Sequence, residues 1–458
     1  MYDLSSAYDL VNPATGEVFR SIEMTTADGV DAAVARAAAA FPAWRDVAPA
    51  DRARLLRRYA EVVDQHSEEL ARTEVENAGH TIGNARWEAG NVRDVLTYYA
   101  AAPERLFGRQ IPVAGGLDLT VAEPLGVVGV IVPWNFPMPI AAWGFAPALA
   151  AGNTVVLKPA ETTPLTALRL AELALEAGLP EGVLQVVPGF GTEAGARLVE
   201  HPDVRKIVFT GSAAVGRAIM ARCADQVKRV TLELGGKSPN IVFADADVEK
   251  AAAAAPYGVF DNAGQDCCAR SRIYVEASAY DAFMERFLDA CRGVVVGDLL
   301  DEKTEMGPLI SAAQKARVAG FVDAVAPEDI AYRGEVPDGA GFWFPPTVVT
   351  GVAPDAAIQC EEVFGPVVTV TPFDSEAEVI AAANATEYGL SGSIWTRDLS
   401  RALRVSRAVQ SGNLSVNSNS SVRYSTPFGG FKQSGLGREL GPDSLAAFTE
   451  TKNIFIAL

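Results

Sequence analysis

A cysteine on a glycine-flanked turn is the first residue whose type and position suggest catalysis. Cys267 lies in the segment NAGQDCC at residues 262–268, ahead of an expected strand at residues 272–275. A thiolate that a substrate can reach is a nucleophile, whereas most cysteines are small, buried and inert. From this segment alone, a buried structural cysteine is the favoured interpretation.

Two polar residues in apolar surroundings change that balance. Asn135 lies in the segment PWNFP at residues 133–137, a rigid turn in which a buried amide needs partners or a function. Glu233 lies in LELGGK at residues 232–237, at the end of an expected strand. Desolvation there raises the pKa of a carboxyl group toward that of a general base, and a buried structural carboxylate is the alternative.

Three turns have the composition of nucleotide-binding segments. The segment GFGTEA at residues 189–194 follows a strand and opens a helix, but this fingerprint alone is weak and a plain turn is favoured. The segment FTGSAAVG at residues 209–216 is a better phosphate turn, because a helix N-terminus offers unpaired N–H groups. In KPAE, at the end of another strand, Lys158 and Glu161 can hold ribose hydroxyls. A structural role stays open for each turn taken singly.

Length and charge exclude several classes of function. A chain of 458 residues exceeds what one hydrophobic core supports, so two large domains are expected. The net charge of -18 disfavours nucleic acid and anionic membranes as partners, since both repel an acidic surface. The five cysteines form neither a zinc pattern nor a disulfide framework, so we expect no metal site and a reducing compartment. The N-terminus lacks the pattern of a secretory signal, and a cytoplasmic location follows as an expectation.

The elements that must position these residues alternate between strands and helices. Three or four helices are expected within residues 26–102, and two extended runs, 117–122 and 126–132, are expected to form a hairpin leading into a core strand. The apolar stretch 126–151 contains too many prolines for a membrane span and is interpreted as buried strand and loop. Successive strand–helix units then run to residue 232, with strands at 154–158, 183–187, 206–209 and 229–232 and helices at 165–177, 193–201 and 213–224.

A second alternating region begins after the paired glycines at 235–236. Its expected helices are 248–259, 277–291, 312–325 and 376–383, and its expected strands are 272–275, 367–370, 392–395 and 413–416. The pattern therefore predicts an α/β protein with two doubly wound domains that join near Leu234.

Taken together, the motifs resemble the aldehyde dehydrogenase superfamily over nearly the whole chain. The resemblance begins at NPATGE (12–17), passes through the segments above and continues through EVFGP (362–366), PFGG (427–430) and GRE (437–439) to FTE (448–450). It implies a Rossmann-like cofactor-binding domain at 1–104 and 125–234 and a catalytic domain at 235–435. Segments 105–124 and 436–458 would bridge the subunits of a homodimer or homotetramer.

The resemblance also implies a role for each polar residue described above. Cys267 would attack an aldehyde, and the side chain of Asn135 with the backbone N–H of Cys267 would stabilise the oxyanion of the thiohemiacetal. After hydride transfer to NAD, Glu233 would activate the water that hydrolyses the thioester to a carboxylic acid. A coenzyme-A-acylating enzyme and a catalytically silent relative remain the alternatives, and the presence of Glu233 disfavours the first.

The implied cofactor residues favour NAD. Glu161 would accept bonds from both ribose hydroxyls and repel a 2′-phosphate, while Lys158 leaves NADP open as a second coenzyme. The implied cofactor-binding residues are Pro133, Trp134, Lys158, Glu161, Gly211, Ser212, Gly216, Leu234, Glu362 and Phe364.

The small-molecule aldehyde is the least determined partner. The expected substrate pocket consists of Phe136, Trp143, Phe260, Asp266, Cys268, Ser420, Ser421 and Phe428. Asp266 beside the nucleophile favours an amino or betaine-like aldehyde, with a turn-capping aspartate as the alternative. Many relatives carry a lysine where this chain has Gly144, so the resemblance leaves open whether Glu439 takes part in a proton relay or is only structural.

Overall fold

Four helices form the N-terminal layer, and capping residues mark the start of α1 and α4 and the end of α3. The computed structural model describes residues 7–420 and 422–458. A two-stranded antiparallel sheet, β1 (Ala7–Val11) and β2 (Val18–Glu23), precedes α1 (Ala27–Arg45), α2 (Pro49–Gln65), α3 (Ser67–Ala78) and α4 (Ile82–Ala100). The side chains of Thr26 and Thr81 cap α1 and α4, and Gly79 ends α3 in the left-handed conformation. The expectation of three or four helices is confirmed, whereas the β1–β2 pair was not expected.

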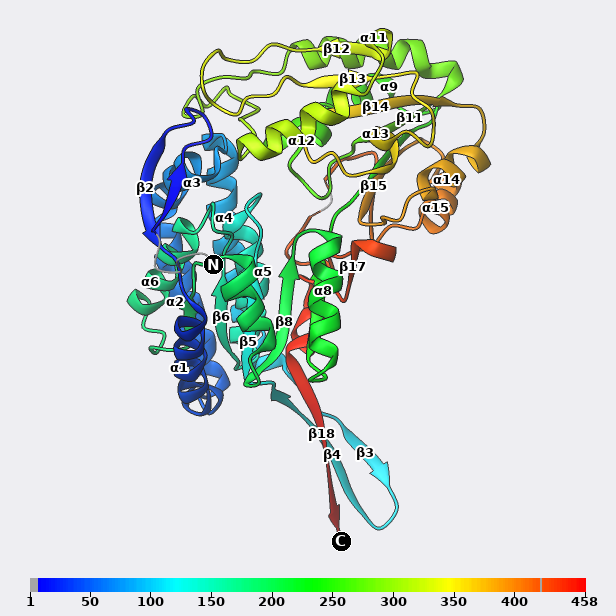
Figure 1. Cartoon of the computed structure of the whole chain (residues 1–458). Helices are drawn as coiled ribbons and strands as arrows, with labels where there is room; N and C mark the ends of the chain where they lie inside the picture. The colour runs from blue at the N-terminus through cyan, green and yellow to red at the C-terminus, as the bar shows by residue number, and fades with distance from the viewer. Residues whose placement is uncertain (1–6, 421) are drawn as a thin grey trace.

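A six-stranded sheet carries the first set of strand–helix units (Figure 1). Its order is β17 (Gly435–Leu436), β9 (Arg229–Glu233), β8 (Val204–Thr210), β5 (Val127–Ile131), β6 (Thr154–Lys158) and β7 (Leu184–Val186). All neighbours are parallel except β17, which pairs antiparallel with β9. One face is covered by α2, α4, α5 (Pro137–Ala150) and α6 (Leu165–Glu176), and the other by α1, α7 (Ala196–Glu200) and α8 (Ala213–Ala224). Such a sheet binds ligands at the carboxyl ends of its strands.

Helix α5 corrects the interpretation of residues 126–151 as strand and loop. The stretch forms β5 and then a helix in which every residue is buried. Pro137 and Pro139 lie in the first turn, where backbone N–H groups have no intrahelical partner, so the prolines do not weaken the helix there. Complete burial also removes the amphipathic period that identifies a helix. Among the residues that the structure describes, no helix combines the length and the apolar character needed to cross a membrane.

A seven-stranded sheet carries the second set of units. Its order is β12 (Ile330–Arg333), β13 (Thr347–Val349), β14 (Val367–Phe373), β11 (Arg272–Glu276), β10 (Pro239–Val242), β15 (Ser391–Trp395) and β16 (Asn413–Val416), and only β12 is antiparallel to its neighbour. Helices α9 (Val248–Ala254), α10 (Tyr257–Phe260), α11 (Tyr280–Arg292) and α12 (Ala312–Asp323) cover one face, and α14 (Glu376–Asn384) and α15 (Leu399–Ala408) cover the other. The expected helix 248–259 is broken into α9 and α10, with Pro256 at the start of α10.

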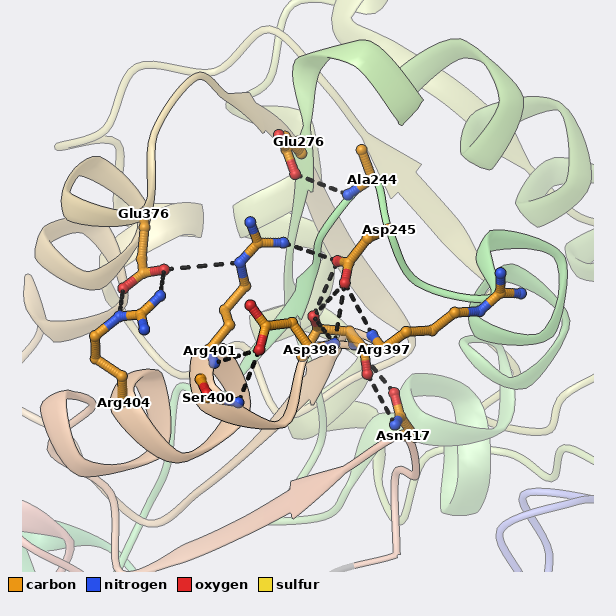
Figure 2. Close-up of polar contacts among 11 residues, drawn as sticks. Ala244, Asp245, Glu276, Glu376, Arg397, Asp398, Ser400, Arg401, Arg404 and Asn417 are labelled. Atoms are coloured by element: carbon orange, nitrogen blue, oxygen red, sulfur yellow. Dashed lines mark hydrogen bonds and ion pairs between the residues drawn. The ribbon is translucent and has the colours of Figure 1, made fainter.

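A polar network fixes α14 and α15 to the ends of β10 and β15 (Figure 2). Asp245 accepts hydrogen bonds from the hydroxyl of Thr396, from the backbone N–H of Arg397 and from the guanidinium of Arg401, the last at 2.8 Å. The same guanidinium lies 4.6 Å from the ring centroid of Phe243, and Glu376 of α14 pairs with Arg404 of α15. The contacts orient these two helices on the outer face of the sheet.

A three-stranded ribbon extends away from both sheets and ends at the C-terminus (Figure 1). It consists of β3 (Gln110–Val113), β4 (Gly116–Pro124) and β18 (Thr449–Ala457). The expected hairpin between runs 117–122 and 126–132 is therefore wrong. β3 and β4 form an antiparallel hairpin with Gly115 in the turn, where its φ of 75° suits a tight turn. β5 instead lies in the parallel sheet, between β8 and β6.

Candidate active site

The loop that carries Cys267 has an unusual backbone. Asn262, Ala263 and Gly264 follow α10 with φ values of 48°, 53° and 71°. Residues other than glycine rarely adopt this left-handed backbone conformation. A run of three such residues is stable only where contacts with the surrounding structure fix the backbone. At Gly264 a Cβ atom would lie 2.0 Å from the carbonyl oxygen of Gly365, so only glycine fits. The backbone therefore passes close to the 362–366 segment before it reaches Cys267.

Two amides hold this loop against the turn at residues 133–137. Asn135 donates from Nδ2 to the carbonyl of Gln265 at 3.0 Å, and Asn262 donates from Nδ2 to the carbonyl of Asn135 at 2.7 Å. The side chain of Gln265 in turn accepts from the backbone N–H of Ile310 at 2.9 Å. The structure thus brings Asn135 and Cys267 to one cleft, as the sequence motifs require.

The thiol of Cys267 is partly exposed, and its pKa is raised. The neighbouring Cys268 thiol is the largest cause, followed by burial and the negative charge of Asp266. Asp266 is engaged locally, because its Oδ1 accepts from the backbone N–H of Cys268 at 2.8 Å. A thiol in this environment stays protonated at neutral pH, so the nucleophile forms only when a base takes its proton.

Two buried carboxyl groups lie next to one another at the end of β9. Glu233 and Glu439 are each 3% exposed, and within the described part of the chain none of their carboxyl oxygens has a hydrogen-bond partner. Burial raises the pKa of Glu233 well above its usual value, and the charge of Glu439 raises it further. Burial raises the pKa of Glu439 to about 8. Burial therefore makes each of these two carboxyl groups a stronger base than an exposed glutamate.

One cavity of about 450 Å³ opens above the carboxyl ends of the parallel strands. Seven of the ten predicted cofactor residues line it, together with Asn135, Glu233 and Cys267: Pro133, Trp134, Gly211, Ser212, Leu234, Glu362 and Phe364. Lys158, Glu161 and Gly216 are not among its lining residues. Lys158 ends β6, and its Nζ lies 3.4 Å from Oε2 of Glu161, while Gly216 permits close packing of α8 on Leu234.

The walls of this cavity fit a dinucleotide. Ser212 caps α8, and the first turn of that helix presents backbone N–H groups of the kind that bind phosphate. Glu362 accepts a hydrogen bond from the backbone N–H of Gly236 at 2.7 Å, and burial raises its pKa to about 7. A Cβ atom at position 235 would lie 2.5 Å from Oε2 of Glu362, so glycine keeps the chain close to this carboxyl group. The rings of Trp134 and Phe364 meet edge to face with centroids 5.4 Å apart.

A second cavity, of about 320 Å³, reaches Cys267 and Glu233 from the other side. Six of the predicted substrate residues line it: Phe136, Trp143, Asp266, Cys268, Ser420 and Phe428. The rings of Trp143 and Phe428 lie 5.4 Å apart. Phe260 is not among the lining residues, because its side chain is buried in the core beside the seven-stranded sheet, and Ser421 lies outside the described residues.

Several lining residues were missed by sequence reasoning. Asn84 and Trp87 of α4 and Tyr257 and Asp261 near α10 line the second cavity. Burial raises the pKa of Asp261 to about 6, and Asn84 donates a hydrogen bond to it at 2.6 Å. Trp87 is 51% exposed, and its position off the apolar period of α4 is a signal that the sequence alone offers. In the first cavity the missed residues are Gln314, Arg317, Glu387 and Tyr388.

The glycine-rich segment at residues 189–194 lies away from both cavities, in keeping with the favoured interpretation as a plain turn. Its Glu193 accepts a hydrogen bond from the backbone N–H of Ala27 at 3.1 Å. That contact satisfies one of the free donors at the start of α1.

Comparison with known proteins gives consistent matches over the whole chain. The model of the "Aldehyde dehydrogenase family" matches residues 2–454. The phenylacetaldehyde dehydrogenase of Pseudomonas fluorescens is 44% identical over 98% of this chain and 92% of its own length. The crystal structure of an NAD-dependent aldehyde dehydrogenase from Sinorhizobium meliloti superposes with a TM-score of 0.96 at 43% identity, covering 99% and 92% of the two chains. That of betaine aldehyde dehydrogenase from Staphylococcus aureus, in complex with NAD+, gives 0.95 at 37% identity, covering 98% and 91%.

Proposed function

Because the chain belongs to the aldehyde dehydrogenase family and is an NAD-dependent enzyme of that family, we propose that Cys267, Asn135 and Glu233 carry its reaction. The observation that supports this assignment is the meeting of both cavities at Cys267 and Glu233. A thiol, an amide donor and a carboxyl base at the junction of two cavities are the groups needed to oxidise an aldehyde to an acid through a thioester.

Acylation begins when Cys267 loses its proton. The sulfur attacks the aldehyde carbon, and Nδ2 of Asn135 with the backbone N–H of Cys267 donates to the oxygen that becomes negative. NAD, when bound, supplies the acceptor for the hydride that leaves this carbon. The cysteine then carries an acyl group as a thioester, and Asn135 holds the carbonyl oxygen.

Deacylation depends on Glu233. Its carboxylate takes a proton from water, the water oxygen bonds to the thioester carbon, and the carbon–sulfur bond breaks to release the acid. The raised pKa of Glu233 matches this step, because a stronger base removes the proton from water more readily. A coenzyme-A-acylating enzyme would have to exclude such a base, so we expect the enzyme to form free acid in the absence of coenzyme A.

Different residues in and beside the first cavity would contact different parts of the cofactor. Lys158 and Glu161, at the end of β6, would hold the adenosine ribose, and Ser212 with the first turn of α8 would contact the pyrophosphate. Glu362 and Phe364 would contact the nicotinamide half. The carboxylate of Glu161 disfavours a 2′-phosphate, so NAD is the expected coenzyme, and NADP is tolerated to the extent that Lys158 offsets this repulsion.

An aromatic or alkyl aldehyde is the substrate class that the second cavity supports best. Phe136, Trp143 and Phe428 form its apolar wall. Asp266 gives less support to a cationic substrate than the sequence indicated, because it caps the Cys268 N–H and lies near Arg270. An amino or betaine-like aldehyde remains the second candidate, favoured by Asp261. Initial rates over aliphatic, aromatic and amino aldehydes distinguish the two classes.

The ribbon supports an oligomer. β18 is an edge strand of its sheet and carries the exposed apolar side chains Ile454, Phe455 and Ile456. Segments 105–124 and 436–458 would bridge subunits of a homodimer or homotetramer by covering this edge. A stable monomer in light scattering at micromolar concentration would contradict this. A cytoplasmic location accords with a thiol that has to stay reduced.

Single cysteine replacements test the nucleophile. Cys267→Ser should abolish oxidation, whereas Cys268→Ser should keep most of it, because only the first thiol lines both cavities. Rates of NADH and acid formation without coenzyme A measure both. Similar losses in the two variants reject the assignment of Cys267.

A further inference from the structure

Three buried side chains that can bind a metal ion meet between α3 and α4. Glu74 lies on α3, His80 lies in the turn that joins the two helices, and Glu88 lies on α4. One ligand atom of each side chain lies within 4.8 Å of those of the other two. Glu74 and Glu88 are fully buried, and His80 is 3% exposed. The proposed reaction uses none of these three residues.

The turn between the helices fixes the position of the imidazole. Gly79 ends α3 with a φ of 76°, and a Cβ atom there would lie 2.9 Å from Cβ of Pro13, so only glycine fits. Thr81 then caps the start of α4. The chain therefore passes from one helix to the next within a few residues, and His80 lies at this junction.

The oxygens of this cluster are mostly without partners among the residues that the structure describes. Nδ1 of His80 contacts Oε1 of Glu88. Both carboxyl oxygens of Glu74 and Oε2 of Glu88 lack a partner in hydrogen-bond geometry, although the hydroxyl of Thr166 lies near Glu74. Buried acceptors are nearly always paired, so three unpaired oxygens around one imidazole indicate a missing ligand.

The charge of the cluster points to a cation. Asp261 adds a further negative charge to those of the two glutamates. Burial and then the charge of Glu88 raise the pKa of Glu74 to about 8, because the ionised carboxyl groups lack a compensating positive charge. Burial lowers the pKa of His80, which favours the neutral imidazole that binds metals.

His80 also has the second contact that is typical of a metal-binding histidine. The backbone carbonyl of Asn135 accepts a hydrogen bond from the ring. In most metal sites the ring nitrogen that does not bind the ion makes such a contact, which orients the imidazole. The ring lies beside that of Phe136, with centroids 5.8 Å apart. An ion bound by His80 would therefore help to fix the turn at residues 133–137.

We propose that Glu74, His80 and Glu88 bind one divalent cation, and that the donor set selects Zn²⁺. Zn²⁺ takes imidazole nitrogen and carboxylate oxygen at about 2.0–2.2 Å in a tetrahedral arrangement. Ligand atoms around such an ion are roughly 3.4 Å apart, so separations of up to 4.8 Å have to close by at most about 1.4 Å. An unpaired carboxyl oxygen can complete the fourth position. Mg²⁺ and Ca²⁺ prefer more oxygen ligands than two carboxyl groups supply.

This ion would be structural. None of its three ligands is among the residues that line the two active-site cavities, so it would not meet the substrate. It would join α3, α4 and the turn at residues 133–137. The expectation of no metal site rested on the pattern of the cysteines, and this cluster contains none.

Metal uptake and thermal stability of the full-length protein test the proposal. Asp266, Cys267 and Cys268 form a second group of potential ligands, so Cys267→Ser with Cys268→Ser is the background for every measurement. After treatment with a chelator, this protein should take up one Zn²⁺ per chain. Its melting temperature should rise by about 3 °C when free Zn²⁺ exceeds the dissociation constant a hundredfold. Mg²⁺ should give neither effect.

Replacement of each ligand identifies the site. In the same background, Glu74→Gln and Glu88→Gln remove a carboxylate with little change in shape, and His80→Gln removes the imidazole. Each variant should lose the bound Zn²⁺ and the rise in melting temperature, because amides are weaker ligands than carboxylate and imidazole.

His66 provides a matched control. Its two ring nitrogens lie 2.6 Å from Glu69 and 3.6 Å from Glu176, but these side chains are partly exposed, and Arg169 pairs with Glu69 at 2.7 Å. A charge-paired, solvated group of this kind does not need an ion. His66→Gln should therefore bind Zn²⁺ as the background protein does.

The outcomes decide between an ion and protons as the groups that neutralise this cluster. Absence of Zn²⁺ uptake in the background protein overturns the site, and so does uptake that survives in the three ligand variants. If those variants fail to fold, Co²⁺ bound to the background protein decides: the intense visible absorption of a four-coordinate ion supports the site, and the weak absorption of a six-coordinate ion overturns it. The background lacks both active-site thiols, so the result does not depend on the proposed catalytic roles.

Discussion

Glu233→Gln should separate acylation from deacylation. The two side chains have the same shape, and the carboxyl oxygens of Glu233 have no hydrogen-bond partner within the described part of the chain, so no hydrogen bond to them is broken by the change. Burial and the charge of Glu439 both raise the pKa of this carboxyl group, which means that its charged form is disfavoured there, and an amide carries no charge. We therefore expect the variant to fold with a stability within about 1 kcal/mol of the parent.

The expected kinetic effect follows from the loss of a general base. Such a base contributes about 10²–10⁴-fold to a rate, which corresponds to roughly 2.7–5.4 kcal/mol of activation free energy. Acylation uses the thiol of Cys267 and the amide of Asn135, so the loss falls on hydrolysis. Mixing the variant with NAD and aldehyde should give a burst of up to one NADH per active subunit, followed by a steady state slowed by that factor.

Stopped-flow absorbance measures the burst, and mass spectrometry of the Cys267 peptide detects the acyl adduct. The raised pKa of the thiol predicts that the burst slows as the pH falls, more steeply if Glu233 also helps to deprotonate it. Glu387→Gln removes another carboxylate that lines the cofactor cavity and should show no change in the ratio of burst to steady state. Absence of both burst and adduct in the Glu233 variant at alkaline pH refutes the assignment.

Three other changes test separate parts of the site. Glu161→Gln should raise the ratio of kcat/KM with NADP to that with NAD by about tenfold, since one partly exposed charge near a phosphate is worth about 1–2 kcal/mol; an unchanged ratio counts against this residue. Gly264→Ala should lower activity by about 10²-fold or more, because its Cβ would meet the carbonyl of Gly365, and near-normal rates would show that the loop tolerates the change. Glu74 is fully buried beside Glu88, and in the cation-free enzyme its pKa is raised to about 8 mainly by burial. The folded state therefore binds a proton that the unfolded state releases above about pH 4.5, so stability falls by up to about 1.4 kcal/mol per pH unit between there and pH 8; Glu74→Gln should flatten this fall in melting temperature, and parallel curves would contradict it.

Elements defined by local signals were predicted well from the sequence. The expected helix 213–224 has the bounds of α8, because a small-residue turn, the capping Ser212 and the apolar period coincide there. The expected strand 413–416 likewise has the bounds of β16. The fold class of two largely parallel α/β sheets follows from such local units, because strands that alternate with helices along the chain form parallel sheets covered by those helices.

Elements defined by distant partners were not predicted. β4 has the alternation of a hairpin strand, but its long partner is β18, more than three hundred positions later in the chain. α5 was missed because it is buried on all sides, and β12 and β13 because they are short. Local pattern does not encode which distant strand supplies the hydrogen-bonding partner.

The residues of the candidate site were also predicted where a local motif marks them and missed where only the topology places them. Cys267, Asn135 and Glu233 belong to compact motifs, and the structure brings all three to one cavity, although their roles remain to be tested. Lys206 has no motif of its own: a lysine near the start of a strand is typical of an exposed end. Only the register of β8 and β9 places it on the face of Glu233. The position of such a buried lysine follows from topology, because the side chains that share its face come from strands that are distant in the chain.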